Sequence, residues 1–426
     1  MLAFALALVF LIPASLACLH YLALVAAGLL PRRTPRRAEA THTIAVLIPA
    51  HDEEAALSET LRSLDRADYP LHLVRRLVVA DNCSDRTAEI ARSAGADCVV
   101  RRDPLRPGKG HAVAFGLETA LAEGADAVLI LDADCTVDPE LLLRLDAELA
   151  TGADAVQCSV VSANAGGAGY AAAVGADLDN LMAAGAARLG GSVPLRGTGM
   201  LFRAELLRRH PWRVSGPTED AEYREVLRKA GVPVRFAADR AVHCLPPPDA
   251  GALLMQRRRW RSALYVPGRH PFFRLLGSKP LVLAHLLLTT ATVPAIAPET
   301  SAMIWLAALH LATAATYTPS ILRVGRPAGA AELLRSLWLV ARLALVALGS
   351  FGRRERGWRR TPREPLRSLA SSGAAPVSAA APVPEAGPGG DPRARSRSEP
   401  GIAAGLGSAR RSKAAGIRHA ARESVR

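Results

Sequence analysis

The segment AVLILDADCTVDPE, residues 127–140, shows most directly how this chain folds. Its apolar run, Ala127–Leu131, is short and ends in polar residues, which is typical of a buried strand. Asp132 and Asp134 follow at once, and alternate residues of an extended chain point the same way. The pair can therefore address one divalent ion or one diphosphate. A D-x-D is also common by chance, and the alternative is a solvated turn before a helix that starts at residues 138–140.

Four further apolar runs have the length and composition of strands, and helical stretches lie between them. The strand candidates are Ile44–Ile48, Leu77–Ala80, Cys98–Val100 and Ala155–Val160, and the helical stretches include Glu54–Arg66 and Arg86–Ala94. Alternation of this kind indicates an α/β domain with a largely parallel sheet. Ligands of such sheets bind beyond the carboxyl ends of the strands, so functional residues are expected directly after each strand.

Acidic residues do follow the first two strands, in AHDEE at residues 50–54 and in DNCSD at residues 81–85. Lys109 lies in a glycine-containing segment before a helical run that begins near His111. Glycines and a helix amino terminus let the backbone approach a phosphate, although a flexible loop is the plain alternative. The segment lacks the spacing of a full P-loop.

Thr218-Glu219-Asp220 opens the amphipathic run AEYREVLRKAG. Threonine and acidic residues in a first turn are ordinary helix capping, and this is the structural interpretation. The functional interpretation is a carboxylate at a helix start that takes a proton from an acceptor hydroxyl. Farther on, an arginine run ends at Trp260, whose ring could stack on a sugar.

Residues 1–30 contain no Asp, Glu, Lys or Arg and are long enough to cross a bilayer as a helix. The stretch has no basic start and is longer than the apolar part of a usual signal peptide, which favours a retained transmembrane anchor. Arginines at residues 31–37 follow it, and such residues tend to stay in the cytoplasm. We therefore expect an integral protein of the plasma membrane whose domain at residues 41–275 is cytoplasmic.

Apolar runs return after that domain. Pro280–Ala297 and Ser301–Thr318 predict a transmembrane hairpin over residues 280–318. A third segment, residues 331–351, contains Arg335 and Arg342, and a charge in mid-span is costly. This segment therefore crosses the bilayer or lies in its interface, and four spans stay open beside the favoured three.

The net charge of +14, from 53 Lys and Arg against 39 Asp and Glu, is concentrated beside the apolar segments and toward the C-terminus. The better balance between residues 41 and 240 gives no reason to expect a nucleic-acid partner. Ala, Gly, Pro, Ser and Arg dominate residues 368–426, which predicts a disordered basic tail. The six cysteines lack zinc-site spacing and are expected to be reduced. They are Cys18, Cys83, Cys98, Cys135, Cys158 and Cys244.

From about Thr43 through the hairpin, the chain resembles the membrane-embedded family 2 glycosyltransferases, the group that includes cellulose, chitin and hyaluronan synthases. Four signatures occur in the family's order: the strand end at Asp81, Asp132-x-Asp134, Thr218-Glu219-Asp220, and Gln256-x-x-Arg259-Trp260. The stretch Gly197-Thr198-Gly199 also matches a family element near the acceptor. The resemblance implies a GT-A type nucleotide-diphospho-sugar transferase domain, of α/β class, with flanking transmembrane helices.

The resemblance also implies roles for individual residues. Asp220 would be the catalytic base, and Asp134 with Asp132 would bind Mg²⁺ or Mn²⁺. The residues implied to bind the nucleotide sugar are Ala50, Glu53, Asp81, Lys109, Asp132, Gln256 and Arg259, and those implied at the acceptor site are Gly197, Thr198, Glu219 and Trp260. The sequence departs from the family at His51-Asp52, where Tyr-Asn is commoner, and at Asn82-Cys83.

The function implied is inverting transfer of a sugar from a nucleotide-diphosphate sugar, expected to be a UDP-sugar. The acceptor would be a glycan or lipid at the membrane, in cell-envelope or exopolysaccharide synthesis. A polyprenyl-phosphate or lipid monosaccharide transferase is the nearer alternative. A nucleotidyltransferase would carry a glycine-rich loop after its first strand, and a catalytically silent membrane scaffold would not need the acidic residues.

Overall fold

The computed structural model describes residues 2–31, 34–35, 39–162, 167–245, 249–260, 279–325, 327 and 329–348. The predicted tail at residues 368–426 lies outside these ranges, as do residues 261–275 at the end of the predicted catalytic domain.

Within the described residues, eight strands form one sheet in the order β3-β2-β1-β4-β7-β6-β8-β5. The strands are β1 (Ile44–Ala50), β2 (Val74–Asp81), β3 (Asp97–Arg101), β4 (Ala127–Ile130), β5 (Cys135–Val137), β6 (Ala155–Ser162), β7 (Met200–Arg203) and β8 (Val234–Cys244). The first four pair in parallel, whereas β7 lies antiparallel between β4 and β6. β8 is parallel to β6 and antiparallel to β5.

The five predicted strands are confirmed, but the prediction of a largely parallel sheet is incomplete, because it missed three strands. β5 and β7 have only three and four residues, too few to show a periodicity of their own. Asp132-Ala133-Asp134 is also a turn and not an extended segment, since the Cys135 N–H donates to the Asp132 carbonyl at 3.2 Å. This turn separates β4 from β5.

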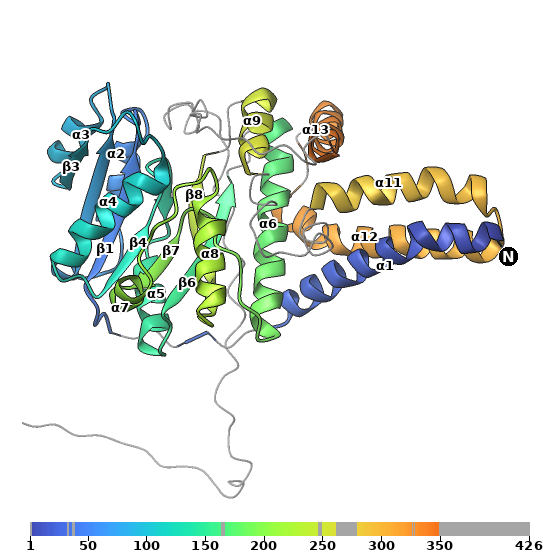
Figure 1. The fold of residues 1–426 in the computed structure, drawn as a ribbon, viewed down its shortest axis with the longest axis horizontal. Coiled ribbons are helices and arrows are strands. Elements are labelled where there is room, and N and C mark those ends of the chain that lie inside the picture. Colours follow the sequence, from blue (N-terminus) through green and yellow to red (C-terminus); the bar gives the residue numbers. More distant parts are fainter. Residues whose placement is uncertain are drawn as a thin grey trace, which may run out of the picture. The chain divides into compact units, whose positions relative to one another are not determined.

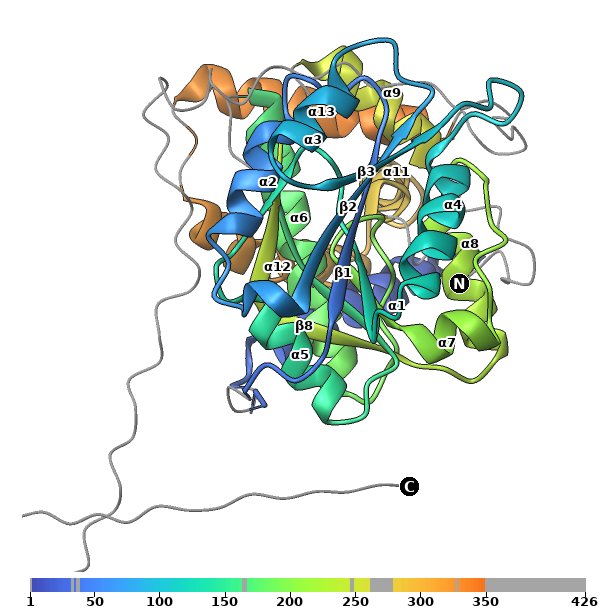
Figure 2. The same cartoon turned by 90° about the vertical axis from the view of Figure 1, so that its left-hand side faces the viewer.

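Helices cover both faces of the sheet (Figure 2). One face carries α2 (Leu57–Asp65), α3 (Thr87–Ser93) and α5 (Leu141–Ala150), and the other carries α4 (Lys109–Ala122), α7 (Ala204–Arg209) and α8 (Glu219–Lys229). The short 3-10 helix η1 (Leu71–Leu73) leads into β2. Alternate residues of β1 supply each core, since Ile44, Val46 and Ile48 face the first set while Ala45 and Leu47 face the second. Both faces of β1 are therefore buried.

A second group of helices is apolar. It comprises α1 (Leu2–Leu29), α11 (Lys279–Ile296), α12 (Thr300–Val324) and α13 (Ala330–Leu348), while α9 (Ala250–Trp260) precedes α11 in the chain. α1, α11 and α12 lie side by side in Figure 1. Among the described helices, α1 over Ala3–Leu29 and α11 over its whole length are long and apolar enough to cross a membrane.

The helix α6 (Gly167–Arg188) connects the two groups, because it contacts β6 and β8 as well as α1, α12 and α13. Leu178 and Leu181 of α6 are buried against Val25 of α1. The backbones approach closely at two glycines: a Cβ added to Gly28 would overlap the Leu181 carbonyl, and one added to Gly185 would overlap the Leu24 carbonyl. The sheet and α1 are thus joined through one helix.

This crossing gives a first prediction. We expect Gly185→Ala to lower the stability of the protein by about 1–3 kcal/mol, because the backbone of α1 has to move to admit the methyl group. The matched control is Gly175→Ala on the same helix, where nothing lies within 4 Å of an added Cβ. Apparent melting temperatures of the purified protein in detergent measure the difference. Equal melting temperatures for the two variants would show that the close crossing does not exist.

Two cysteines correct an expectation from the sequence. Cys135 of β5 and Cys244 at the end of β8 form a disulfide, so the prediction that all six cysteines are reduced is wrong for this pair. The two residues are 109 positions apart and become register partners only through the antiparallel pairing of β5 with β8. Spacing along the sequence could not indicate that contact. Cys18, Cys83, Cys98 and Cys158 are free thiols.

Candidate active site

Two carboxylates meet in the turn between β4 and β5. Ligand atoms of Asp132, Asp134 and Cys135 lie within 4.8 Å of one another, so the structure brings the two predicted metal ligands together. The Asp132 N–H donates to Thr198 Oγ1 at 3.0 Å, which fixes the turn against the loop before β7. Because the Cys135 sulfur is held in the disulfide, the donors offered to an ion are carboxylate oxygens. Hard divalent cations prefer such oxygen donors.

Lys109, the first residue of α4, joins three parts of the site. Its ammonium group pairs with Asp132, donates to the Gly197 carbonyl at 2.6 Å and lies 3.8 Å from Glu219 Oε1. Burial acts to lower the pKa of Lys109, but Asp132 and Glu219 together raise it above the ordinary value. The lysine is therefore held as a cation among carboxylates. From the sequence, Lys109 was predicted to bind the nucleotide sugar. Its contacts with Asp132, Gly197 and Glu219 could not be predicted from the sequence.

Asp220 lies in the first turn of α8, beside this lysine. Its Oδ1 accepts the Ala221 N–H at 2.8 Å, and a Cβ on Gly197 would be 3.7 Å from its Oδ2. Burial and then the charge of Glu219 raise the pKa of Asp220 to about 7, although Lys109 acts in the opposite direction. Thr218 makes no side-chain cap hydrogen bond, so simple helix capping does not account for this segment. A carboxyl group with a pKa near neutrality is suited to accept a proton.

The loop Gly197-Thr198-Gly199 lies between these groups and β7. Gly197 and Gly199 have φ angles of +79° and +64°, and a Cβ on Gly199 would overlap the Cys158 sulfur. Gln157 of β6 holds the loop, because its Nε2 donates to the Thr198 carbonyl at 2.9 Å. Glycine is therefore required at residue 199 both by conformation and by space. Gln157 was missed from the sequence, where it stands inside an ordinary strand.

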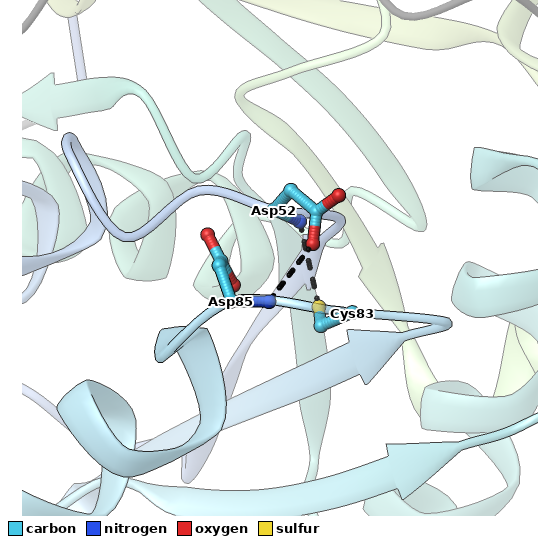
Figure 3. Close-up of side chains that lie close together, drawn as sticks. All are labelled: Asp52, Cys83 and Asp85. Carbon is cyan, nitrogen blue, oxygen red and sulfur yellow. Dashed lines mark hydrogen bonds between the residues drawn. The ribbon is translucent and has the colours of Figure 1, made fainter.

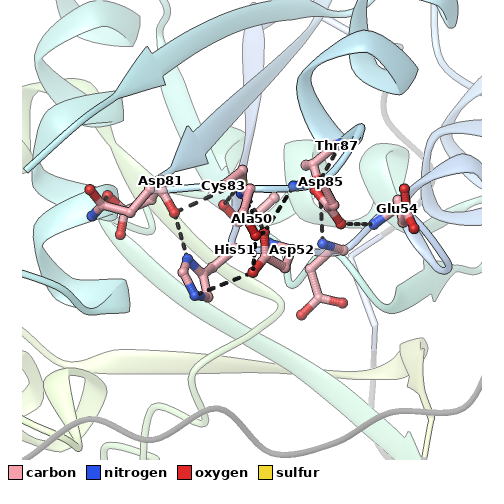
Figure 4. A network of polar contacts seen from close by, with 11 residues as sticks. Ala50, His51, Asp52, Glu54, Asp81, Cys83, Asp85 and Thr87 are labelled. Carbon is pink, nitrogen blue, oxygen red and sulfur yellow. Dashed lines mark hydrogen bonds and ion pairs between the residues drawn. The ribbon is translucent and has the colours of Figure 1, made fainter. Parts of the chain in front are cut away.

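The loops after β1 and β2 are tied to each other (Figure 4). His51 Nδ1 lies 2.7 Å from the Asp81 carbonyl oxygen, and the Glu53 N–H donates to Thr87 Oγ1 at 2.9 Å. Ala50 at the end of β1 accepts a hydrogen bond from the Cys83 thiol at 3.4 Å. The predicted nucleotide-binding positions Ala50 and Glu53 thus belong to one double loop.

Asp52, Cys83 and Asp85 form the centre of this double loop (Figure 3). Asp52 adopts a positive φ of 53°, and its Oδ1 accepts the N–H groups of Ser84 at 2.7 Å and Asp85 at 3.3 Å. These hydrogen bonds use the carboxylate to join two loops. Asp52, one of the two residues at which the sequence departs from the family, therefore has a structural role in joining these loops.

Asp81 is the last residue of β2, at the same carboxyl-terminal end of the parallel strands as Asp132. Its contacts are separate from those of Asp132, Asp134 and Lys109. It is 4% exposed, and its Oδ1 accepts a hydrogen bond from Arg101 Nη1 at 2.6 Å and one from Asn82 Nδ2 at 3.0 Å. Strand β1 separates it from the strand that precedes Asp132. Asp81 thus lies about 10 Å across the sheet from the carboxylate pair. Arg101 was missed, although it is the register partner of Asp81 on β3.

The predicted signature at residues 256–260 lies on α9. Gln256 is 9% exposed, whereas Trp260 is 41% exposed and its ring centroid lies 4.3 Å from the Arg257 guanidinium carbon. The side chain of Arg259 is outside the described residues. The predicted roles of Gln256, Arg259 and Trp260 at the diphosphate and the acceptor remain predictions.

The sequence pattern of the glycosyltransferase like family 2 matches residues 42–263, just over half of the chain. The chain belongs to this glycosyltransferase family. The matched region contains all four predicted signatures, from the Asp81 strand end to Trp260.

Curated relatives match shorter stretches of this glycosyltransferase. It is 37% identical over 97 residues to the probable glycosyltransferase YdaM of Bacillus subtilis, a match covering 22% of the chain and 23% of YdaM. It is 35% identical over 118 residues to the undecaprenyl-phosphate 4-deoxy-4-formamido-L-arabinose transferase of Pseudomonas paraeruginosa, which covers 26% of the chain and 34% of that protein. The chain thus matches well under two thirds of either relative's length.

A solved structure shares the fold of this glycosyltransferase. The mannosyltransferase PcManGT from Pyrobaculum calidifontis, in complex with GDP-Man and Mn²⁺, superposes with a TM-score of 0.50 at 19% identity. The likeness covers 82% of the chain and 97% of that protein, and at this identity it shows the fold alone. The predicted GT-A fold is confirmed, with a mixed sheet.

Proposed function

We propose that this glycosyltransferase transfers a sugar, with inversion, from a nucleotide-diphosphate sugar to a glycan or lipid acceptor at a membrane. One observation carries the proposal: Lys109 links Asp132 of the carboxylate pair to Glu219, beside a carboxyl group whose pKa is about 7. A site for the leaving diphosphate and a proton acceptor are thereby held in one cluster. A catalytically silent scaffold would not require Asp220 to be poised in this way.

Asp132 and Asp134 fit a divalent cation, because their oxygens lie within 4.8 Å and the neighbouring sulfur is in a disulfide. Mg²⁺ or Mn²⁺ bound there would supply positive charge against the leaving diphosphate. The complex of the mannosyltransferase PcManGT with Mn²⁺ and GDP-Man supports a metal and a nucleotide sugar in this chain. The nucleoside is proposed to bind beside Asp81, Ala50 and Glu53, at the carboxyl ends of the same parallel strands, and a UDP-sugar is the proposed donor.

The residues divide the reaction between them. Asp220 takes the proton of the acceptor hydroxyl, whose oxygen attacks the anomeric carbon from the face opposite the nucleotide. The new carbon–oxygen bond forms as the bond to the diphosphate breaks, and the electron pair leaves with the diphosphate. Lys109 holds Glu219 and Asp132 in place, so Asp220 is the carboxylate assigned to the proton. A single displacement of this kind inverts the configuration at the sugar carbon.

The membrane part of the proposal is supported by where apolar side chains lie. Helix α13 buries Glu332 and Ser336 but leaves Leu334, Leu337 and Trp338 more than half exposed. In water such a surface is unfavourable, whereas in a lipid interface it is expected. We propose an anchor at residues 1–30, a hairpin at 280–318, an interfacial third segment and a cytoplasmic catalytic domain in the plasma membrane. This arrangement fits the subtype that includes cellulose, chitin and hyaluronan synthases.

The pH dependence of the reaction gives a second prediction. Because Asp220 acts as a base only when ionised and its pKa is about 7, kcat/KM should rise about tenfold per pH unit below pH 7 and level off above it. Initial rates at constant ionic strength and saturating Mn²⁺ measure the profile. An ordinary aspartate would be ionised well below this range, so a flat profile down to about pH 5 would contradict the assignment.

The function itself is tested with purified membranes that contain the full chain. They are incubated with a panel of labelled nucleotide sugars, with and without Mn²⁺, and the released nucleotide and labelled products are separated. We expect metal-dependent transfer from one of these donors. Product analysis then distinguishes a polymer or glycan from a lipid monosaccharide. Absence of nucleotide release with every donor would contradict the proposal and favour a scaffold.

A further inference from the structure

Three basic residues lie near one carboxylate, where the loop before β7 approaches the apolar helices. We call Arg196, Arg257, Lys279 and Asp179 the Asp179 cluster. Lys279 Nζ lies 2.6 Å from Asp179 Oδ1, and Arg196 Nη2 lies 3.9 Å from Asp179 Oδ2. Arg257 interacts electrostatically with Asp179 and Arg196. These residues come from α6, α9, α11 and the loop before β7, so the cluster joins four separate parts of the chain.

The cluster carries more positive than negative charge. Asp179 can neutralise one of its three cations, and the other acid on this part of α6, Asp177, lies 3.9 Å from Arg323 of α12 instead. Burial lowers the pKa of Arg257, and repulsion from Arg196 adds to the effect while Asp179 opposes it. Cations held below the surface without a full set of anions are unfavourable, so a further anion would stabilise them.

An anionic group can reach this place. The side chains of Asp179, Lys279 and Arg196 are 41%, 21% and 17% exposed. The cluster is therefore not a sealed ion pair inside the core. Arginine and lysine at this depth are the donors that proteins use for phosphate groups.

The position of the cluster relative to the candidate base indicates what the anion belongs to. Arg196 directly precedes Gly197, and a Cβ added to Gly197 would lie 3.7 Å from Asp220 Oδ2, so Arg196 is the chain neighbour of a residue that lies against Asp220. On another side, Arg257 stacks on the partly exposed ring of Trp260, a surface suited to a sugar. Lys279 is the first residue of α11, one of the two described helices that are apolar enough to cross a membrane. The Asp179 cluster is thus connected, through a chain neighbour or a direct contact, to the glycine beside Asp220, to the ring of Trp260 and to an apolar helix.

We propose that the Asp179 cluster binds the phosphate or diphosphate of a lipid-linked sugar acceptor, with its lipid chain toward the apolar helices and its sugar hydroxyl toward Asp220. This inference rests on the proposed function and names its acceptor class. A base with the position of Asp220 suits a hydroxyl acceptor, so the sugar of the acceptor and not its phosphate is the nucleophile. The donor diphosphate is assigned to Asp132 and Asp134 instead.

The test measures binding of farnesyl diphosphate to the full chain in detergent micelles, with UDP and Mn²⁺ at saturation to fill the donor site. Farnesol serves as the neutral probe and inorganic pyrophosphate as the lipid-free one. We expect farnesyl diphosphate to bind more tightly than both. Arg196→Gln and Lys279→Gln should each weaken that binding about tenfold or more, because each removes a charge-assisted hydrogen bond. Arg196→Lys, which keeps the charge, should retain most of it.

The matched control is Arg188→Gln at the end of the same helix α6, where the side chain donates to the Pro31 carbonyl at 2.6 Å. This variant should bind farnesyl diphosphate like the unchanged protein. Melting temperatures establish that the variants are folded, and Arg196→Lys serves if a glutamine variant is not. Full binding in the glutamine variants would overturn the inference, as would equally tight binding of inorganic pyrophosphate.

Three outcomes separate this inference from the proposed function. If farnesyl diphosphate binds only when UDP and Mn²⁺ are left out, the Asp179 cluster belongs to the donor site and the inference is wrong. If labelled sugar is transferred in an Asp220-dependent reaction while farnesyl diphosphate does not bind, the inference fails and the function stands. If farnesyl diphosphate binds through the cluster but no nucleotide sugar is turned over, the proposed function fails.

Discussion

Asp220→Asn is expected to slow sugar transfer by about two to four orders of magnitude and to leave nucleotide-sugar binding intact. Asparagine keeps the shape of the side chain, and its oxygen can still accept the Ala221 N–H, but it cannot take a proton from the acceptor. Labelled-product formation measures the rate, and equilibrium binding of the nucleotide sugar measures the donor site. The loss should therefore appear in kcat and not in donor affinity.

The control for this variant is Glu225→Gln on the same helix. Glu225 forms an ion pair with Arg228 at 2.7 Å and is not part of the cluster around Lys109. It should retain near-normal transfer, so that loss of charge on α8 is separated from loss of the base. Normal turnover by Asp220→Asn would show that another group accepts the proton.

Asp134→Asn is expected to lower transfer at least about a hundredfold and to make nucleotide-sugar binding insensitive to Mn²⁺. A bound metal contributes several kcal/mol of charge stabilisation, and each 1.36 kcal/mol is a factor of ten in rate. Asp134 is chosen over Asp132, because Asp132 also pairs with Lys109 and its loss would disturb two interactions. Titrations of nucleotide-sugar binding against Mn²⁺ give the direct readout.

Asp154→Asn is the comparison for the metal experiment. Asp154 lies 3.4 Å from Arg203 and 3.6 Å from Arg209, on the surface next to β6, and takes no part in the proposed site. It should show the same Mn²⁺ dependence as the unchanged protein. If Asp134→Asn behaves identically, the carboxylate pair is not the metal site.

The parts of the fold that could be predicted are those that local sequence determines. β1 and β4 are continuous apolar runs with acidic residues after them, and both strands were predicted, while the roles of those acidic residues remain predictions. β5 and β7 are too short to show a pattern, so the mixed character of the sheet was missed. α6 was missed as well, because its alanines and glycines carry only a weak apolar periodicity.

Within the site, the predictable residues were those in recognisable motifs, whereas their supporting contacts could not be predicted. Lys109 was found, but not its pairing with Asp132 and Glu219. Arg101 and Gln157 lie in ordinary strands, and each matters only through a residue distant in sequence. Contacts of this kind depend on strand order and register, which one sequence does not reveal.

The crossing of α6 with α1 has a practical consequence for work on this enzyme. Val25 on one helix covers Leu178 and Leu181 on the other, and two glycines bring the backbones together. A truncated protein that begins at β1 would expose the apolar side chains of α6 to water, because α1 would no longer cover them. Detergent or lipid would then be needed to keep the truncated protein from aggregating during purification. The two groups of helices meet through a side-chain interface, so a truncation between α1 and β1 removes one side of that interface.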